Sequence, residues 1–171
     1  MLQLLASEYR PLIQDILAYS ICACALIWGM GPERAIAAIW LVIFEWVPGL
    51  YELFWGVKYQ LASTDMFLAT LDVAAGLGWV LIALNANRNY PMLIAALQLL
   101  VIAAHLARGA IDSIAPVAYA LMVTAPGWLQ LLLLGLGLAR HLLRTKRYGS
   151  YREWRASVEW NGLFPSSRKS F

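Results

Sequence analysis

The chain has 171 residues, of which 61% are hydrophobic and 13% are charged, and its mean hydropathy is +0.64. Soluble domains carry about a quarter charged residues and roughly half apolar ones. The shortage of charge excludes an ordinary soluble globule and a disordered chain. The composition therefore predicts an integral membrane protein.

The net charge of +3 is concentrated near the end of the chain. Eight of the thirteen basic residues lie at or beyond position 140: Arg140, Arg144, Lys146, Arg147, Arg152, Arg155, Arg168 and Lys169. A short basic tail after an apolar stretch is typical of a cytoplasmic anchor under the positive-inside rule. We attribute the basicity to the membrane surface and expect no nucleic-acid partner.

Five apolar stretches are long enough to predict transmembrane helices, at about 20 residues per bilayer crossing. They cover about 12–30, 35–55, 65–84, 91–107 and 117–139. Pro48-Gly49 lies inside the second stretch and predicts a kink there. Pro126-Gly127 is expected to separate an irregular lead-in from the fifth span. The fold class is an all-α bundle with short loops.

The distribution of basic residues predicts the orientation of this bundle. With five spans, Arg34, Arg88 and the eight tail residues fall on one side, while Arg10, Lys58 and Arg108 fall on the other. This asymmetry places the C-terminus in the cytoplasm and favours a bacterial inner membrane. If the first segment lies along the surface, the bundle has four spans and both ends inside.

Residues 1–143 are expected to form the bundle and residues 144–171 a basic cytoplasmic tail. Ser150 and Glu153 have the spacing of a capping box, which predicts a short interfacial helix. Lipid headgroups are the expected partners of Arg144, Lys146, Arg147, Arg152, Trp154 and Arg155. Tyrosines near the span ends, Tyr119 among them, fit an aromatic belt at the membrane interface.

Polar residues at membrane depth are the candidates for function, because a charge at the bilayer centre costs about 2.5 to 3.5 kcal/mol even on lenient scales. Three stretches each carry a polar pair seven residues apart, which is about two helical turns and one face. The candidate seam comprises Glu45, Glu52, Asp65, Asp72, Gln98, His105, Arg108 and Asp112. These groups either only satisfy one another, or they carry protons, a small cation or a polar ligand.

No cofactor is predicted, although a tetrapyrrole bound by His105 is one option that the sequence leaves open. The two histidines, His105 and His141, fall on opposite sides of the bilayer and cannot jointly bind one haem. A five-coordinate tetrapyrrole on His105 alone remains open. Cys22 and Cys24 point about 200° apart on a helix, and no zinc pattern exists in the sequence, so no metal site is expected.

Helix-packing signals are stronger than chemical ones. Small residues at Ala74, Gly78, Gly135 and Gly137 predict close helix contacts. Motifs for catalysis are missing, so no enzyme is predicted. The leading interpretation is an accessory or structural subunit that packs against a larger membrane complex or against itself. The alternatives are a small proton or cation transporter using the seam, and a pigment- or haem-binding protein.

Overall fold

The computed structural model describes residues 9–55, 66–111, 115–149 and 154. Within these ranges the chain is helical. The elements are α2 (Tyr9–Trp28), α3 (Gly31–Trp40), the π-helix η1 (Leu41–Trp46), α4 (Val47–Trp55), α5 (Met66–Asn85), α6 (Tyr90–Ala110) and α7 (Pro116–Tyr148). α3, η1 and α4 follow one another without a break and form one long helical unit. We call this unit, and each of α2, α5, α6 and α7, a rod, so that the described chain contains five rods.

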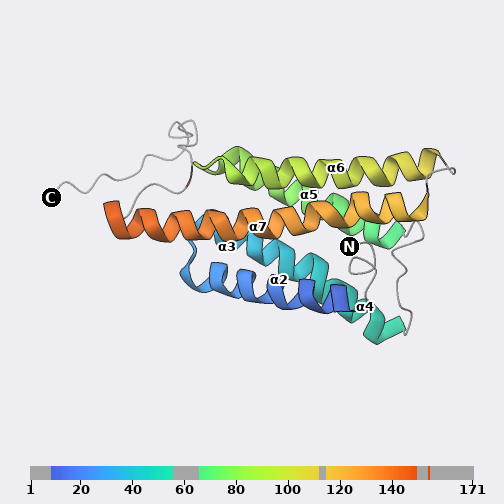
Figure 1. The fold of residues 1–171 in the computed structure, drawn as a ribbon, viewed down its shortest axis with the longest axis horizontal. Helices are drawn as coiled ribbons and strands as arrows, with labels where there is room; N and C mark the ends of the chain where they lie inside the picture. The colour runs from blue at the N-terminus through green and yellow to red at the C-terminus, as the bar shows by residue number, and fades with distance from the viewer. Residues whose placement is uncertain (1–8, 56–65, 112–114, 150–153, 155–171) are drawn as a thin grey trace, which may run out of the picture.

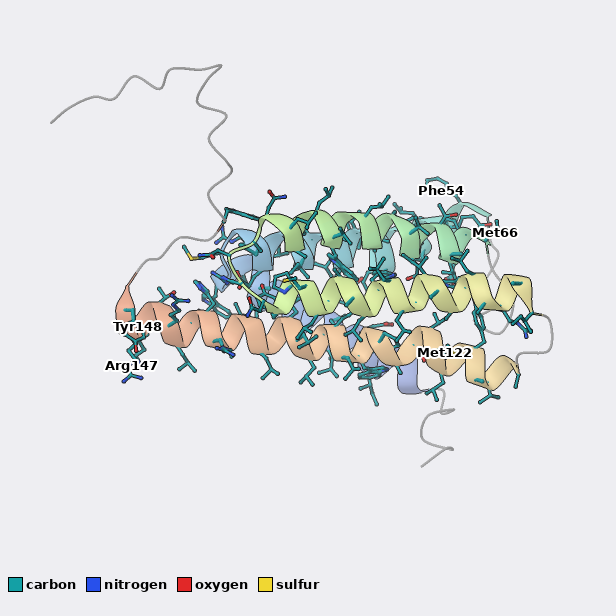
Figure 2. All side chains as sticks on the ribbon, turned by 90° about the horizontal axis from the view of Figure 1, so that it is seen from above. Phe54, Met66, Met122, Arg147 and Tyr148 are labelled. Carbon is teal, nitrogen blue, oxygen red and sulfur yellow. The ribbon has the colours of Figure 1, made fainter. Side chains whose placement is uncertain are left out.

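Four helical segments are long and apolar enough to cross a membrane: Gly31–Phe54, Met66–Asn85, Tyr90–Ala110 and Val117–Tyr148. The apolar part of α2, Ile13–Trp28, is shorter. Large apolar side chains point outward, among them Leu77 and Leu81 of α5, which are 64% and 62% exposed, as the sticks in Figure 2 illustrate. The structure therefore confirms an all-helical bundle and supports a membrane protein. The choice between four and five spans depends on α2.

The helices lie side by side along the long axis of the molecule (Figure 1). α6 packs against α5 and α7, while α2 packs against α3 and α7. Figure 2 shows Tyr148 at one end of the bundle and Met66 at the other. We call these the Tyr148 end and the Met66 end.

Two prolines inside helices are accommodated differently. The expectation that Pro126-Gly127 divides the fifth stretch is wrong, because α7 continues through Pro126; a proline removes one backbone hydrogen bond, and the packed flanks hold the helix together. Pro48 follows η1, where the backbone N–H of Val47 reaches the carbonyl of Val42. This wider turn makes room for the proline ring, and the kink at Pro48-Gly49 stays a prediction.

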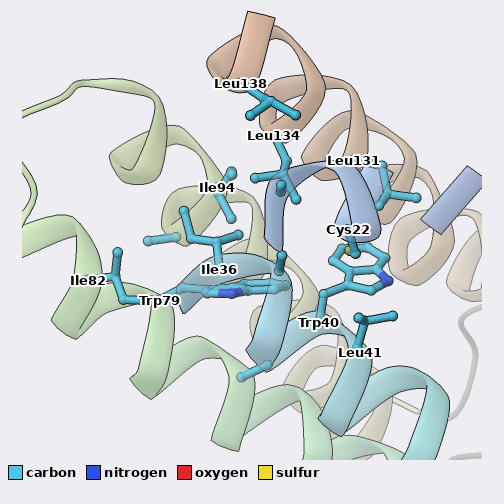
Figure 3. Close-up of a cluster of buried hydrophobic side chains, with 14 of the residues drawn as sticks. Cys22, Ile36, Trp40, Leu41, Trp79, Ile82, Ile94, Leu131, Leu134 and Leu138 are labelled. Atoms are coloured by element: carbon cyan, nitrogen blue, oxygen red, sulfur yellow. The ribbon is translucent and has the colours of Figure 1, made fainter. Parts of the chain in front are cut away.

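The apolar core occupies the half of the bundle toward the Tyr148 end. The rings of Trp40 and Trp79 stack with centroids 5.7 Å apart and an interplanar angle of 21°. Ile36, Ile94 and Leu134, each at most 1% exposed, lie close by. All five rods contribute side chains to this cluster, which is drawn in Figure 3. Apolar packing thus fills the Tyr148 half and leaves the polar residues described below in the Met66 half.

Three of the four residues expected to mediate helix packing lie against neighbours within the molecule. A Cβ added at Gly78 would lie 2.7 Å from Ile39 Cδ1, and one at Gly137 would lie 2.9 Å from ring atoms of Tyr90. At Gly135, the nearest atom to such a Cβ belongs to Ile21 and would lie 3.9 Å away. Ala74 is exposed.

The basic tail begins inside α7, since that helix extends past the expected boundary at residue 143 to Tyr148. Arg144, Lys146 and Arg147 are exposed on its last turns. Arg152 and Arg155 lie outside the described residues. Trp154 pairs with Ala86 in an isolated antiparallel bridge, and the other residues of the expected interfacial helix lie outside the described residues.

Candidate functional site

The centre of the polar site is Asp72 on α5, which is 7% exposed. Gln98 on α6 donates from Nε2 to Asp72 Oδ1 at 2.7 Å and to its main-chain oxygen at 3.1 Å. Because both amide hydrogens of Gln98 go to one residue, α5 and α6 are fixed in register at this point. Gly76, one turn further along α5, leaves room for the Gln98 side chain, whose Cγ would lie 3.4 Å from an added Cβ.

His105 continues the network toward the Met66 end. Its Nε2 lies 2.7 Å from Asp72 Oδ2, and its Nδ1 lies 2.7 Å from the Tyr119 hydroxyl on α7. In the neutral imidazole, Nε2–H donates to the carboxylate and Nδ1 accepts from the tyrosine. The Arg108 guanidinium carbon lies 5.9 Å from the centroid of the Tyr119 ring and closes this end of the network.

Gln130 on α7 extends the network in the other direction. Its Nε2 donates to Gln98 Oε1 at 3.0 Å and to the carbonyl of Ile94 at 3.3 Å. The Asp72 network, as we call it, therefore comprises Asp72, Gln98, His105, Tyr119 and Gln130. Tyr119 and Gln130 lie eleven positions apart on α7, about 16 Å along the helix axis.

In every hydrogen bond between side chains of the Asp72 network, the donor can be placed so that its hydrogen lies on the side nearer the Asp72 carboxylate. Its members are between 1% and 8% exposed, so water contributes little to their solvation. Hydrogen bonds to a carboxylate are stronger than neutral ones, and they offset part of the cost of burying its charge. The network therefore stabilises one buried negative charge near the middle of the bundle.

A cavity of about 200 Å³ adjoins the Asp72 network. All five rods contribute to its wall. The polar lining residues are Gln14, Asp15, Glu45, Asp72, Gln98, Thr124 and Gln130. Trp40 and Phe44 provide aromatic surface, and several aliphatic side chains complete the wall. Asp15 is exposed, so one edge of the cavity reaches the outside of the bundle.

Glu45 reaches this cavity from η1. It accepts a hydrogen bond from the Tyr19 hydroxyl and lies within electrostatic range of Asp15, both on α2. A π-helical turn shifts the direction of the side chains that follow it, and such turns are frequent at functional sites. The sequence placed Glu45 in a seam with Asp72, and the structure places both in the wall of one cavity.

The remaining members of the expected seam have different positions. Glu52 of α4 is half-buried but is not part of the cavity wall. Its expected place in a common stripe with Glu45 fails because η1 changes the helical period between them. Arg108 contacts the network through Tyr119. Asp65 and Asp112 lie outside the described residues.

Sequence reasoning missed three contributors. Tyr119 was assigned to the aromatic belt but is 3% exposed inside the bundle. Gln130, 2% exposed, was overlooked because only ionisable residues were sought in the longest charge-free stretch. A single glutamine within a run of leucines was the available signal. Trp40 carried no signal that distinguishes a cavity wall from a core.

The histidine option for a tetrapyrrole meets an obstacle in this geometry. Both ring nitrogens of His105 are engaged, with Asp72 and with Tyr119, so axial ligation requires breaking one of these contacts. Within the described ranges, no three His, Cys, Asp or Glu side chains are grouped so that they could hold a metal ion.

A second polar cluster lies at the Tyr148 end. Glu33, which is fully buried, forms an ion pair with Arg88 in the turn between α5 and α6. Arg88 Nη2 also lies 3.4 Å from His141 Nδ1 on α7, and the Thr145 hydroxyl lies 3.4 Å from the same nitrogen. This cluster joins three rods at the end opposite Tyr119.

Comparison of the chain with family models, with curated proteins and with solved structures gives no match. The function is therefore inferred from the geometry of the site.

Proposed function

We propose that the protein is a small membrane transporter that binds a proton or a small cation inside its helical bundle. The observation that carries this proposal is that the Asp72 carboxylate has two roles. Its carboxylate is at once part of the wall of a cavity of about 200 Å³ and the acceptor for His105. A buried carboxylate with an imidazole partner beside a cavity is typical of proton- and cation-handling sites in membranes.

The hydrogen bonds favour proton movement between the Met66 end and the cavity. The Nε2 proton of His105 passes to Asp72 Oδ2 while Nδ1 takes the Tyr119 hydroxyl proton, and Tyr119 regains a proton from the Met66 end. In the first two transfers the His105 Nε2–H and Tyr119 O–H bonds break, while an O–H bond on the carboxyl group and an N–H bond on Nδ1 form. The proton that restores the Tyr119 hydroxyl comes from a hydronium ion at the Met66 end, which becomes water, so the net result is one proton moved from that end to the carboxyl group. The 2.7 Å separations at both steps support such a transfer.

The rest of the bundle favours a transporter over an open channel. On the Tyr148 side of Gln130, the buried faces of α7 carry Leu131, Leu134 and Leu138. This apolar packing separates the cavity from the Glu33–Arg88 cluster. A solute bound in the cavity would leave toward the Tyr148 end only after the helices rearrange. We propose further that the Tyr148 end is cytoplasmic, in a bacterial inner membrane, because basic residues accumulate there.

Flux through proteoliposomes tests the proposal. The purified chain is reconstituted with an internal pH-sensitive dye, and a potassium gradient with valinomycin imposes a membrane potential. Asp72→Asn removes the proton acceptor and is expected to lower the flux at least tenfold. Glu52→Gln is the matched control, since it converts a half-buried carboxylate outside the cavity wall, and it is expected to keep the flux.

His105→Gln serves as a second variant, because glutamine keeps hydrogen bonding but has no second ring nitrogen to relay a proton. Size-exclusion profiles identify variants that remain folded. Wild-type flux retained in Asp72→Asn, or absence of flux of both protons and a cation probe in the wild-type protein, overturns the proposal.

An accessory subunit is the second candidate function. The exposed Ala74 on the outer face of α5 supports it, because small residues let a neighbouring helix approach closely. A second copy of the chain or a larger membrane complex would be the partner. Neither the transporter nor the accessory subunit would be an enzyme. Native mass spectrometry of the protein from its own host tests this candidate. Recovery with foreign chains supports it, and a mass of 19.1 kDa or a small multiple of it opposes assembly with other proteins.

A further inference from the structure

We infer that the cavity selects a small organic cation. The inference rests on the proposed function in one respect, namely that the cavity is a solute site. It goes further by naming the chemical class of the solute.

The charges around the cavity select for a cation. Asp15, Glu45 and Asp72 contribute carboxylates from three different rods, and no lysine, arginine or histidine occurs among the described residues of the wall. An anion would meet only repulsion there. The carboxylates are spread around the wall and do not converge as metal ligands within the described chain. A diffuse negative field of this kind suits a cation larger than a metal ion.

The uncharged part of the wall selects for an organic body. Trp40 and Phe44 lie side by side, with ring centroids 5.3 Å apart and planes tilted by 48°, and both line the cavity. Aromatic faces attract ammonium groups, most strongly when water is excluded. Leu68, Leu71 and Val123 add aliphatic surface. Methyl or methylene groups on a positive nitrogen fit this combination better than a hydrated inorganic ion.

The volume limits the size of the solute. Sites for drug-sized molecules enclose about 300 to 1,000 Å³, whereas this cavity encloses about 200 Å³. A cation with a handful of heavy atoms is therefore expected.

Equilibrium binding to the full-length protein in mild detergent tests the inference with three probes of similar size. Choline has the positive nitrogen and a hydroxyl oxygen. 3,3-Dimethylbutan-1-ol is its neutral isostere with carbon in place of nitrogen, and tetramethylammonium keeps the charge without the oxygen. Isothermal titration is expected to show both cations, choline and tetramethylammonium, binding at least tenfold more tightly than the neutral alcohol.

Matched variants assign the preference for charge to residues. Glu45→Gln is expected to reduce this preference, with Glu52→Gln as its control, and the exposed Asp15→Asn replaces it if Glu45→Gln does not fold.

The inference is overturned if no cationic probe binds, if the neutral alcohol binds as tightly as choline, or if Glu45→Gln and Asp15→Asn both leave the preference for charge unchanged. These outcomes are separate from those of the flux assay. Asp72-dependent proton flux without choline binding leaves the transporter proposal standing and removes this one. Selective choline binding without any flux supports this inference and removes the transporter proposal.

Discussion

Gln98 donates both hydrogens of its side-chain amide to Asp72, at 2.7 Å to Oδ1 and 3.1 Å to the main-chain oxygen, while its own Oε1 accepts from Gln130 at 3.0 Å. A single side chain therefore links α5, α6 and α7. Its neighbours are buried, so none of these bonds is easily replaced by water.

Replacing Gln98 by Leu should destabilise the bundle more than replacing Gln130 by Leu. Gln98→Leu deprives Asp72 Oδ1 of a donor and Gln130 of an acceptor, so a loss of about 1 to 3 kcal/mol is expected. Gln130→Leu leaves one buried acceptor, Gln98 Oε1, without its donor, so it should cost less than Gln98→Leu, about 1 kcal/mol. Denaturant titration in mixed micelles measures both free energies of unfolding. Equal losses would show that Gln98 has no central role.

Tyr119→Phe should separate the relay from the packing. The ring and its contact with Arg108 remain, while His105 Nδ1 loses its partner at 2.7 Å. We expect a loss of about 0.5 to 1.5 kcal/mol in the free energy of unfolding and a several-fold fall in proton flux. Tyr148→Phe, at a site that is 72% exposed, is the control. Unchanged flux in Tyr119→Phe would mean that protons reach Asp72 by another route.

The sequence predicted much of the fold because its signals are local. Apolar length placed 65–84 and 91–107 close to the observed α5 and α6. Seven-residue spacing correctly put Gln98 and His105 on one face, and both contact Asp72. Such periodicity depends only on an uninterrupted α-helix.

The rest of the site was not predictable from periodicity alone. η1 changes the register between Glu45 and Glu52, and a π-helical turn has no reliable sequence signature. Tyr119 lies inside the predicted span, but a tyrosine so close to a helix start fits an interfacial belt equally well. Only the packing of α7 against α6 brings its hydroxyl to His105. The cavity depends on how five rods meet, which no single stretch of sequence encodes.

The ion pair at the Tyr148 end yields a test of a different kind. Glu33 is fully buried and its partner Arg88 is 9% exposed, so Arg88→Leu leaves an uncompensated charge. We expect a loss of about 3 to 5 kcal/mol in the free energy of unfolding. The double variant Glu33→Leu with Arg88→Leu should recover most of this loss, because two apolar side chains replace the pair. A double variant less stable than Arg88→Leu alone would contradict this account of the pair.

Two glycines on α7 provide a matched pair for testing the packing. A Cβ at Gly137 would lie 2.9 Å from three atoms of the Tyr90 ring, whereas one at Gly135 would meet nothing closer than 3.9 Å. Gly137→Ala should therefore overpack the contact between α6 and α7 and cost about 1 to 3 kcal/mol. Gly135→Ala should be neutral or stabilise the helix by up to about 1 kcal/mol, since alanine loses less backbone entropy.

Thermal unfolding of the two glycine variants in the same detergent measures the difference. Gly137→Ala is expected to unfold at a lower temperature than the wild-type protein, and Gly135→Ala at the same or a higher one. Tyr90→Leu combined with Gly137→Ala should relieve the overpacking, because the rigid ring is the atom group in the way. If Gly137→Ala is as stable as Gly135→Ala, α6 and α7 are not in close contact at Tyr90, and the register that brings Gln98 to Gln130 would need revision.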